Sequence, residues 1–189
     1  MRILKLFKRY WSWIAPHPAD EIGSGIDGEV YSMLNSPDRV IKICQVFDFD
    51  RFDSTALVLD KLLIEPYAGY ARVYMRGYRK LNAKGYVLHY YVMEKLQPIS
   101  EDESKVFHTI ISHEDRNIIK DYEYGELEKI LEGLQVGLDF DTEKVKFLCQ
   151  AIRFSPIKHL DIHPRNIMKN DNGDFKLIDF DRVQLKEEN

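Results

Sequence analysis

Apolar residues recur at the spacing of an amphipathic helix in five parts of the chain. The first two predicted helices span residues 3–14 and 51–64, the second with an apolar stripe of Ala56, Leu59, Leu62 and Leu63. Three further stripes predict helices through Val106, Phe107, Ile110 and Ile111; through Leu127, Ile130, Leu131 and Leu134; and through Val145, Leu148, Cys149 and Ile152. Ser100 and Glu103 form a capping-box pattern at the start of the third helix, and Thr142 begins the fifth.

Between these helices, apolar and polar residues alternate as they do in half-buried strands. The alternation predicts a strand around residues 40–42 and a pair of strands over 71–81 and 86–93, joined by a turn from Asn82 to Gly85. Near the end of the chain, residues 167–169 and 175–178 are predicted as a hairpin joined across Asn172-Gly173, because Asn-Gly is a strong two-residue turn signal. The polar stretch from Ser112 to Gly125 is either a solvated connector or an insertion that contacts a partner or substrate.

The first helix is both basic and amphipathic. Its apolar face carries Ile3, Leu4, Phe7, Tyr10, Trp11 and Ile14, and its cations are Arg2, Lys5, Lys8 and Arg9. Such a helix, within residues 1–14, lies on an anionic membrane or packs its aromatic face against the chain's own first lobe. We favour packing, because one short helix with four cations binds membranes only marginally.

Composition narrows the class of protein. The chain has 189 residues, 44% of them hydrophobic, and a net charge of −4, which does not suit a general nucleic-acid binder. Its two cysteines, Cys44 and Cys149, stand far apart and are expected to be buried thiols in a reducing compartment. With no apolar run of transmembrane length and no signal-peptide pattern, we expect a soluble, cytoplasmic protein.

Three polar residues near the end of the chain suit a metal site. Asp161 and Asn166 are five residues apart, and Asp179 follows the predicted hairpin. Because a hairpin brings its two ends together, all three side chains should lie at its open end. Carboxylate and carboxamide oxygens suit Mg²⁺, which binds one or two carboxylates and completes its shell with phosphate and water. The alternative is a surface loop with an Asx-turn next to a hairpin.

A glycine-rich segment precedes the predicted strand that contains Lys42. It reads Ile22-Gly23-Ser24-Gly25-Ile26-Asp27-Gly28-Glu29-Val30. Glycines allow a strand-turn-strand flap to bring backbone N–H groups close to phosphate oxygens. A dinucleotide-binding segment of the same spacing should be followed at once by a helix. The alternative is an ordinary glycine-rich hairpin beside an exposed lysine.

Together these segments resemble the protein-kinase-like superfamily, over roughly residues 20–182. The resemblance carries the pattern His159-x-Asp161, then Asn166, then the strand-borne Asp179. It implies ATP and Mg²⁺ as cofactors, Asp161 as catalytic base, and Asn166 and Asp179 as metal ligands. Lys42 would contact the α- and β-phosphates. His163 replaces the family's usual lysine, as in the aminoglycoside-phosphotransferase-like branch, and would contact the γ-phosphate.

The resemblance also implies a nucleotide pocket. Gly23, Ser24, Gly25 and Gly28 would cover the phosphates, and Ile22, Val30 and Val40 would roof the adenine. Met93 would stand at the back of the pocket, with the backbone of Glu94 and Leu96 bonded to adenine, and Met168 and Ile178 would line its floor.

The implied fold is α+β and two-lobed. A basic amphipathic helix occupies residues 1–19, an antiparallel β-sheet lobe with its hinge occupies 20–96, and a small, truncated helical lobe occupies 97–189. Two features depart from the family. The helix at 51–64 lacks the glutamate that pairs with the strand lysine, so Asp60 or Asp53 is expected to take that place. Asp181 stands where most protein kinases have glycine.

The implied activity is that of an ATP-dependent protein kinase. Only ten residues follow Asp179, so we expect no activation segment and no usual platform for a peptide substrate. Protein acceptors, with serine or threonine before tyrosine, are the first expectation, because the extra C-terminal helices of small-molecule phosphotransferases are missing. The chain also resembles, loosely, compact kinases that bacterial pathogens deliver into the host cytosol to act on host proteins. The alternatives are an aminoglycoside-type small-molecule phosphotransferase, favoured by His163-Pro164 and Asp181, and a pseudokinase binding module.

Overall fold

The computed structural model spans residues 1–189 and describes residues 3–11, 18–25, 28–46, 49–81, 86–112 and 124–186. The chain forms two compact units. Unit 1 comprises Met1–Pro66, Arg72–Lys95 and Phe180–Arg182, and unit 2 comprises Tyr67–Ala71, Leu96–Asp179 and Val183–Asn189. A short segment near the end of the chain therefore belongs to the unit that is otherwise built from the first half.

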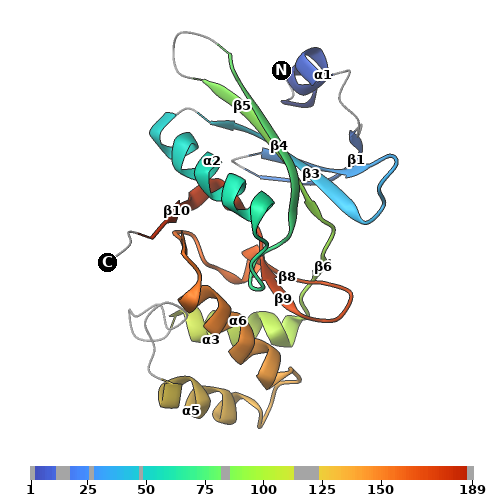
Figure 1. Cartoon of the computed structure of the whole chain (residues 1–189). Coiled ribbons are helices and arrows are strands. Elements are labelled where there is room, and N and C mark those ends of the chain that lie inside the picture. Colours follow the sequence, from blue (N-terminus) through green and yellow to red (C-terminus); the bar gives the residue numbers. More distant parts are fainter. Residues whose placement is uncertain are drawn as a thin grey trace. The chain divides into compact units, whose positions relative to one another are not determined.

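Unit 1 is built on a five-stranded antiparallel sheet with the strand order β1-β2-β3-β5-β4 (Figure 1). The strands are β1 (Pro18–Ser24), β2 (Gly28–Met33), β3 (Arg39–Val46), β4 (Val73–Lys80) and β5 (Val87–Glu94). The strands predicted at 71–81 and 86–93 are confirmed as β4 and β5. The turn expected from Asn82 to Gly85 lies outside the described residues.

One face of this sheet is apolar and packs against α1 (Ile3–Trp11). Successive side chains of a strand point to opposite faces, so alternate residues of β2, β3 and β5 gather on this side. They are Tyr31, Met33, Ile41, Ile43, Leu88, Tyr90 and Val92, and with Phe7 and Trp11 they form a buried core. The ring centroids of Trp11 and Tyr90 are 5.1 Å apart. The expectation that the aromatic face of the first helix packs on its own unit is thus confirmed.

The opposite face of the sheet is covered by α2 (Phe49–Ile64), which contacts β4 and β5. Phe52 of this helix packs against the ring of His89, with the centroids 5.5 Å apart. The helix predicted over 51–64 is confirmed, and Leu59 and Leu62 of its predicted stripe are buried. The stripe is rotated slightly from the prediction, because the other buried positions are Phe52, Thr55 and Val58.

Unit 2 contains three of the described helices, α3 (Glu101–Ser112), α5 (Tyr124–Leu134) and α6 (Thr142–Phe154). All three were predicted from their apolar stripes. The stripes supply its buried residues Val106, Phe107, Ile110, Leu127, Leu131, Val145, Leu148, Cys149 and Ile152. Most of the Ser112–Gly125 stretch lies outside the described residues, so its role as connector or insertion stays open.

The predicted capping box at the start of α3 is confirmed. The Ser100 N–H donates to Glu103 Oε2 at 2.6 Å, and the Glu103 N–H donates to Ser100 Oγ at 3.2 Å. Glu103 also forms an ion pair with Lys169 of β8 (Ile167–Lys169), with Nζ 2.8 Å from Oε2. One side chain therefore both caps the helix and connects it to the strand that follows the expected catalytic loop.

The hairpin predicted between Asn166 and Asp179 is confirmed, but its turn is wider than predicted. β8 pairs with β9 (Phe175–Leu177), from Ile167 opposite Leu177 to Lys169 opposite Phe175. The loop runs over residues 170–174, because Asn170 Oδ1 accepts from the N–H groups of both Asn172 and Asp174. Gly173 takes a φ of 77°, which glycine adopts at little cost.

The remaining strands of unit 2 were not predicted. β6 (Gln97–Pro98) pairs with β8, and β7 (Ile157–His159) pairs with β10 (Val183–Leu185). The protein is therefore of mixed α+β class, with an antiparallel sheet and five described α-helices. Within the described residues, no helix has both the length and the apolar character needed to cross a membrane.

Candidate functional site

The two ends of the glycine-rich segment lie in paired strands, and residues 26 and 27 between them lie outside the described residues. β1 and β2 are antiparallel, with Gly23 opposite Val30, and the Gly25 N–H donates to the Gly28 carbonyl at 2.9 Å. This arrangement agrees with a flap and not with a strand followed by a helix. At position 28 glycine is required for steric reasons, because an added Cβ would lie 2.5 Å from the Ile43 carbonyl oxygen. No described atom lies within 4 Å of a Cβ built on Gly23 or Gly25, so neighbouring chain does not require glycine at these two positions.

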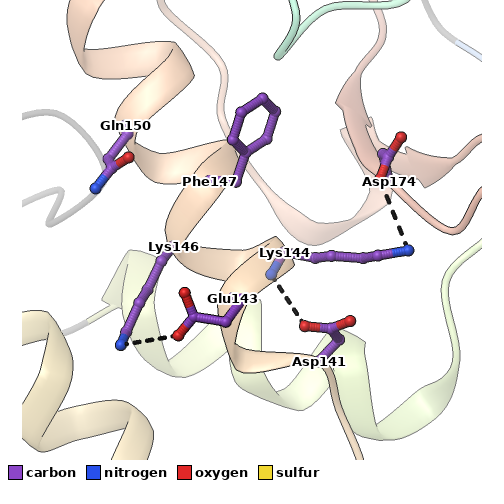
Figure 2. A pocket seen from close by; sticks show the side chains of 7 residues that line it. All are labelled: Asp141, Glu143, Lys144, Lys146, Phe147, Gln150 and Asp174. Carbon is purple, nitrogen blue, oxygen red and sulfur yellow. Dashed lines mark hydrogen bonds and ion pairs between the residues drawn. The ribbon is translucent and has the colours of Figure 1, made fainter.

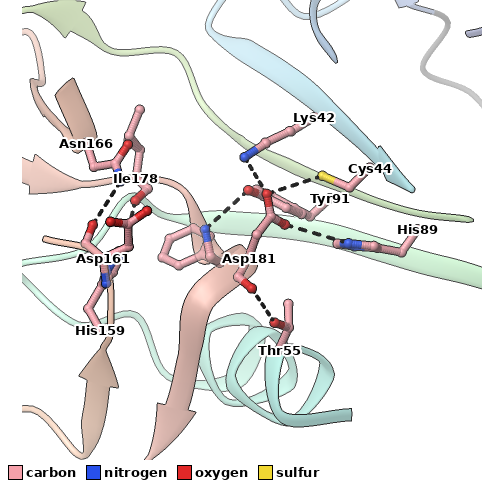
Figure 3. A network of polar contacts seen from close by, with 11 residues as sticks. Lys42, Cys44, Thr55, His89, Tyr91, His159, Asp161, Asn166, Ile178 and Asp181 are labelled. Atoms are coloured by element: carbon pink, nitrogen blue, oxygen red, sulfur yellow. Dashed lines mark hydrogen bonds and ion pairs between the residues drawn. The ribbon is translucent and has the colours of Figure 1, made fainter. Parts of the chain in front are cut away.

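Lys42, on β3, forms a buried ion pair in unit 1. Its Nζ lies 2.5 Å from Asp181 Oδ2 (Figure 3). Lys42 is 7% exposed and Asp181 3% exposed, so water screens the pair little. Asp181 lies in η3 (Phe180–Arg182), the late segment that belongs to unit 1. Removing one partner would leave a buried charge without its counter-ion, which typically costs about 3–5 kcal/mol.

The expectation that Asp60 or Asp53 pairs with Lys42 is wrong for this structure. Asp60 accepts from the guanidinium of Arg76 instead, with Nε 2.5 Å from Oδ1 and a second contact from Nη2 to Oδ2. Asp53 is exposed to solvent. Counting residues along α2 does not identify the partner of Lys42, because the direction of each side chain depends on how the helix packs.

Several side chains of unit 1 surround Asp181. Cys44 Sγ lies 3.6 Å from Asp181 Oδ2, and His89 Nε2 lies 3.6 Å from Oδ1. Cys44 stands opposite His89 in the β3–β5 register, on the sheet face that carries Lys42. Thr55 Oγ1 of α2 donates to the Asp181 carbonyl at 3.4 Å. The ion pair is therefore enclosed by two strands and one helix.

A soft metal ion is the other group that this cluster would suit. Cys44, His89 and Asp181 bring one sulfur, one nitrogen and one oxygen within 4.8 Å of one another. Such donors suit Zn²⁺ better than Mg²⁺, which prefers oxygen. The Lys42 ammonium bonds to the same carboxylate, and its positive charge opposes a second cation there. We therefore interpret the cluster as the surroundings of an ion pair.

The expected catalytic loop is ordered within unit 2. Asn166 Nδ2 donates to the Asp161 carbonyl at 3.0 Å, and the Ile178 N–H donates to the Asn166 carbonyl at 2.9 Å. These bonds bring the backbone of Asp161 and Asn166 and the residue before Asp179 together at the open end of the β8–β9 hairpin (Figure 3). The convergence is present for the backbone of Asp161, Asn166 and Ile178, and the meeting of the Asp161 and Asp179 carboxylates at one metal ion stays a prediction.

His159 joins the catalytic loop to the strand end that leads to Asp179. Its Nδ1 accepts from the Asp161 N–H at 3.2 Å, so we place its proton on Nε2, which lies 3.1 Å from the Ile178 carbonyl oxygen. Burial lowers the pKa of His159 below its ordinary value, although the Ile178 carbonyl and the charge of Asp179 act in the opposite direction. A neutral imidazole therefore bridges the two segments.

Asp179 has a strained backbone. Its φ is 65°, and it is the one non-glycine residue with positive φ in the described part of the chain. An L residue held in the left-handed region costs about 1–3 kcal/mol, and such residues cluster at functional sites. Aspartate and asparagine tolerate this conformation better than most other residues. The backbone of Asp179 is thus consistent with a functional position.

His163 begins η2 (Pro164–Asn166), a short 3-10 helix inside the expected catalytic loop. Its Nδ1 accepts from the Arg165 N–H at 3.2 Å. Because Nδ1 faces this N–H, Nε2 is the ring nitrogen that could contact a phosphate. The expected contact with the γ-phosphate stays a prediction.

The residues expected to line the nucleotide pocket fall into both units. In unit 1, Val40 and Met93 are buried and stand opposite each other in the β3–β5 register, whereas Ile22 is 52% exposed. The Glu94 N–H donates to the Arg72 carbonyl at 3.0 Å, so an adenine contact can use only the Glu94 carbonyl. Leu96, Met168 and Ile178 belong to unit 2 and are partly buried.

Two surface hollows are lined by described residues of unit 2. One, of about 310 Å³, borders the expected catalytic loop and is lined by Pro98, Ile99, Ser100, Glu101, Ser104, Pro164, Arg165, Ile167 and Met168. The larger, of about 520 Å³, lies on α6 beside the hairpin turn (Figure 2). It is lined by Asp141, Glu143, Lys144, Lys146, Phe147, Gln150 and Asp174, and by none of the expected site residues. Its charges pair among themselves, as Lys146 does with Glu143 at 3.2 Å, so we interpret it as a solvated surface.

Sequence reasoning did not identify the surroundings of Lys42. Asp181 was singled out only as a departure from glycine, and Cys44 and His89 had no assigned part in a site.

Comparison with models of known protein families and with curated proteins returned no match to this chain.

Proposed function

We propose that this chain is an ATP- and Mg²⁺-dependent protein kinase with a two-lobed protein-kinase-like fold. The observation that carries the proposal is the loop at the open end of the β8–β9 hairpin. Hydrogen bonds there bring Asp161 and Asn166 together, and the strained Asp179 follows directly after. Two carboxylates and a carboxamide form a donor set that suits Mg²⁺ carrying a phosphate group.

Two features of unit 1 support the same proposal. The β1–β2 hairpin carries glycines that no described neighbour requires at Gly23 and Gly25. Lys42 is buried, and its ammonium is held by a carboxylate, as a phosphate-binding lysine should be. The Lys42–Asp181 pair also weakens the pseudokinase alternative, because the lysine has an acidic partner.

The proposed chemistry assigns a task to each residue. Asp161 accepts the proton of the acceptor hydroxyl as its oxygen bonds to the γ-phosphorus of ATP. The bond from that phosphorus to the β–γ bridging oxygen breaks, and ADP leaves. Asn166 and Asp179 would hold Mg²⁺, which supplies charge neutralisation on the phosphates. Lys42 binds the α- and β-phosphates, and His163 donates one hydrogen bond to the γ-phosphate.

The acceptor is proposed to be a protein hydroxyl, serine or threonine before tyrosine. We propose that the acceptor segment binds at the hollow of about 310 Å³ beside Pro164 and Arg165, which borders the expected catalytic loop. A small-molecule acceptor is the second candidate, because His163 and Asp181 match the aminoglycoside-phosphotransferase-like pattern. An action on host proteins is a further possibility of the first candidate.

The proposal is tested with radiolabelled ATP and Mg²⁺. The purified chain is incubated alone, with a cell lysate and with an aminoglycoside panel. Labelled protein bands support a protein kinase, and labelled drug supports the second candidate. Asp161→Asn should lower transfer by roughly 10²–10⁴-fold, because it removes the general base. Asp171→Asn, the same chemical change at an exposed turn residue, should leave transfer unchanged.

Two outcomes would contradict the proposal. One is that no acceptor becomes labelled and the chain does not bind ATP. The other is that the Asp161→Asn variant transfers phosphate as fast as the parent chain does. Binding of ATP without any transfer would support a binding module instead.

A further inference from the structure

We propose that Asp181 is the positioning residue for Lys42. In the family that the chain resembles, a carboxylate on a helix has this role. This inference rests on the proposed function and goes beyond it, because it assigns a role to a residue outside the expected catalytic set. Asp181 acts through Lys42, and no contact between Asp181 and a substrate is required.

The geometry of the pair is the first support. Lys42 Nζ and Asp181 Oδ2 are 2.5 Å apart, and both side chains are more than nine-tenths buried. A lysine side chain has a flexible stem of four carbons, so its ammonium is fixed only where a partner holds it. At this separation the carboxylate restricts the position of the ammonium, which is the condition for a productive contact with phosphate.

The second support is how firmly Asp181 itself is held. The Phe180 N–H donates to Tyr91 Oη at 3.3 Å, and Thr55 of α2 donates to the Asp181 carbonyl at 3.4 Å. Phe180 is fully buried, with its ring centroid 5.6 Å from that of Tyr91. His89 Nε2 faces the second carboxylate oxygen at 3.6 Å. The segment that carries Asp181 is therefore held to the sheet and the helix, and its Oδ2 is held by Lys42.

The third support is what α2 presents at the same place. Its buried face offers the hydroxyl of Thr55. Of the acids of α2 whose side chains the structure describes, Asp60 is bonded to Arg76 and Asp53 is exposed. The helix thus holds the backbone of the acid-bearing segment, and the acid comes from η3. The lysine then depends on a residue two positions after Asp179. The chain segment that carries the proposed metal ligand also fixes the phosphate-binding lysine.

The test is a double-mutant cycle of Lys42→Met and Asp181→Asn, with two ligands. We measure kcat/KM for ATP, and we measure binding of ATP and of adenosine, which lacks phosphates. Asp181→Asn should lower kcat/KM roughly 10- to 100-fold and weaken ATP binding while leaving adenosine binding unchanged. In the Lys42→Met background the same change should have almost no further effect, since its partner is already gone. Asp60→Asn, which breaks the ion pair with Arg76, is the matched control and should leave kcat/KM unchanged.

If Asp181→Asn does not fold, Asp181→Glu and Asp60→Glu form the second comparison. Asp181→Glu keeps the charge and moves it by one methylene, so it should weaken ATP binding while Asp60→Glu does not. The inference is overturned if the two substitutions lower kcat/KM independently, so that their fold-changes multiply in the double variant. It is also overturned if adenosine binding falls as much as ATP binding. A parent chain that neither binds nor uses ATP would refute the proposed function itself. An active parent with an unaffected Asp181 variant would refute this inference alone.

Discussion

The backbone conformation of Asp179 bears on both the stability of the fold and the proposed function. At φ 65° its backbone lies in the left-handed region, which aspartate, asparagine and glycine enter more easily than branched residues do. A residue kept in a costly conformation implies that something other than stability favours it there.

Three substitutions at Asp179 should separate these effects. Asp179→Asn should keep the fold and lose phosphate transfer, because a carboxylate is removed from the metal donor set. Asp179→Val should in addition lower the free energy of unfolding by about 1–3 kcal/mol, since a β-branched residue tolerates positive φ poorly. Asp179→Gly should be at least as stable as Asp179→Asn and equally inactive. Urea unfolding measures the stabilities, and equal stability of the valine and asparagine variants would contradict the strain.

Local patterns single out residues but not their partners. Lys42, Asp161 and Asn166 were each singled out in this way, and their roles stay predictions. Both cysteines are buried and free of disulfides, as expected. The partner of Lys42 was assigned wrongly. It depends on which side chain of a distant segment reaches the sheet, and 139 residues separate the two members of the pair.

Among the elements, α1 has the clearest energetic role. Its Phe7 and Trp11 are 1% and 8% exposed, and both pack on Tyr90 of β5. The helix is therefore part of the core of unit 1. Its exposed cations Lys5 and Lys8 lie away from that core.

Truncating the Trp11 side chain should destabilise unit 1. Trp11→Ala removes a large buried ring, which typically costs about 3–5 kcal/mol. Lys8→Ala, on the exposed face of the same helix, should change stability by about 0.5 kcal/mol or less. Hydrogen exchange of the β5 backbone amides measures both. Unchanged protection in Trp11→Ala would show that the helix does not support the sheet.

The capping box of α3 makes the stability of unit 2 depend on pH. Burial raises the pKa of Glu103, but the hydrogen bonds from Lys169 and Ser100 outweigh it, so the pKa lies below its ordinary value. A lowered pKa in the folded state means that the carboxylate stabilises the fold. That contribution is present above the unfolded-state pKa and is lost as the pH falls through the folded-state pKa.

Glu103→Gln should therefore lower the stability of unit 2 at pH 7. The difference from the parent chain should shrink as the pH falls through the lowered folded-state pKa of Glu103, where the parent carboxyl becomes protonated. Glu101→Gln, on the exposed side of α3, should have little effect at either pH. Thermal unfolding across this pH range measures the dependence, and a constant difference between Glu103→Gln and the parent would contradict it.

At the scale of elements, prediction succeeded where the signal was local. Helices with a clear stripe, the capping box and the β8–β9 hairpin were all present. The turn of that hairpin was predicted too short, because Asn170 accepts two backbone N–H groups and extends the loop. β7 and β10 were not predicted, since each has three residues and pairs with a strand far away in sequence. Strands this short carry too little alternation to be recognised alone.

At the scale of the whole molecule, the chain returns to unit 1 after building most of unit 2. Phe180–Arg182 belongs to unit 1, whereas Asp179 before it and Val183 after it belong to unit 2. Asp179 and Asp181 are thus divided between the units although they are two residues apart. This crossing is the reason that one short segment can connect the proposed metal site with Lys42.

The sequence by itself determined the helices, most strands and the α+β class, and it singled out the residues that are proposed to perform phosphate transfer. These follow from periodicity, capping and turn chemistry, which act between residues close together in the chain. Only the tertiary structure decided that Lys42 pairs with Asp181, that Asp60 pairs with Arg76, and that α1 closes the core of unit 1. Such contacts depend on the directions that side chains take once strands and helices have packed, and local patterns do not encode those directions.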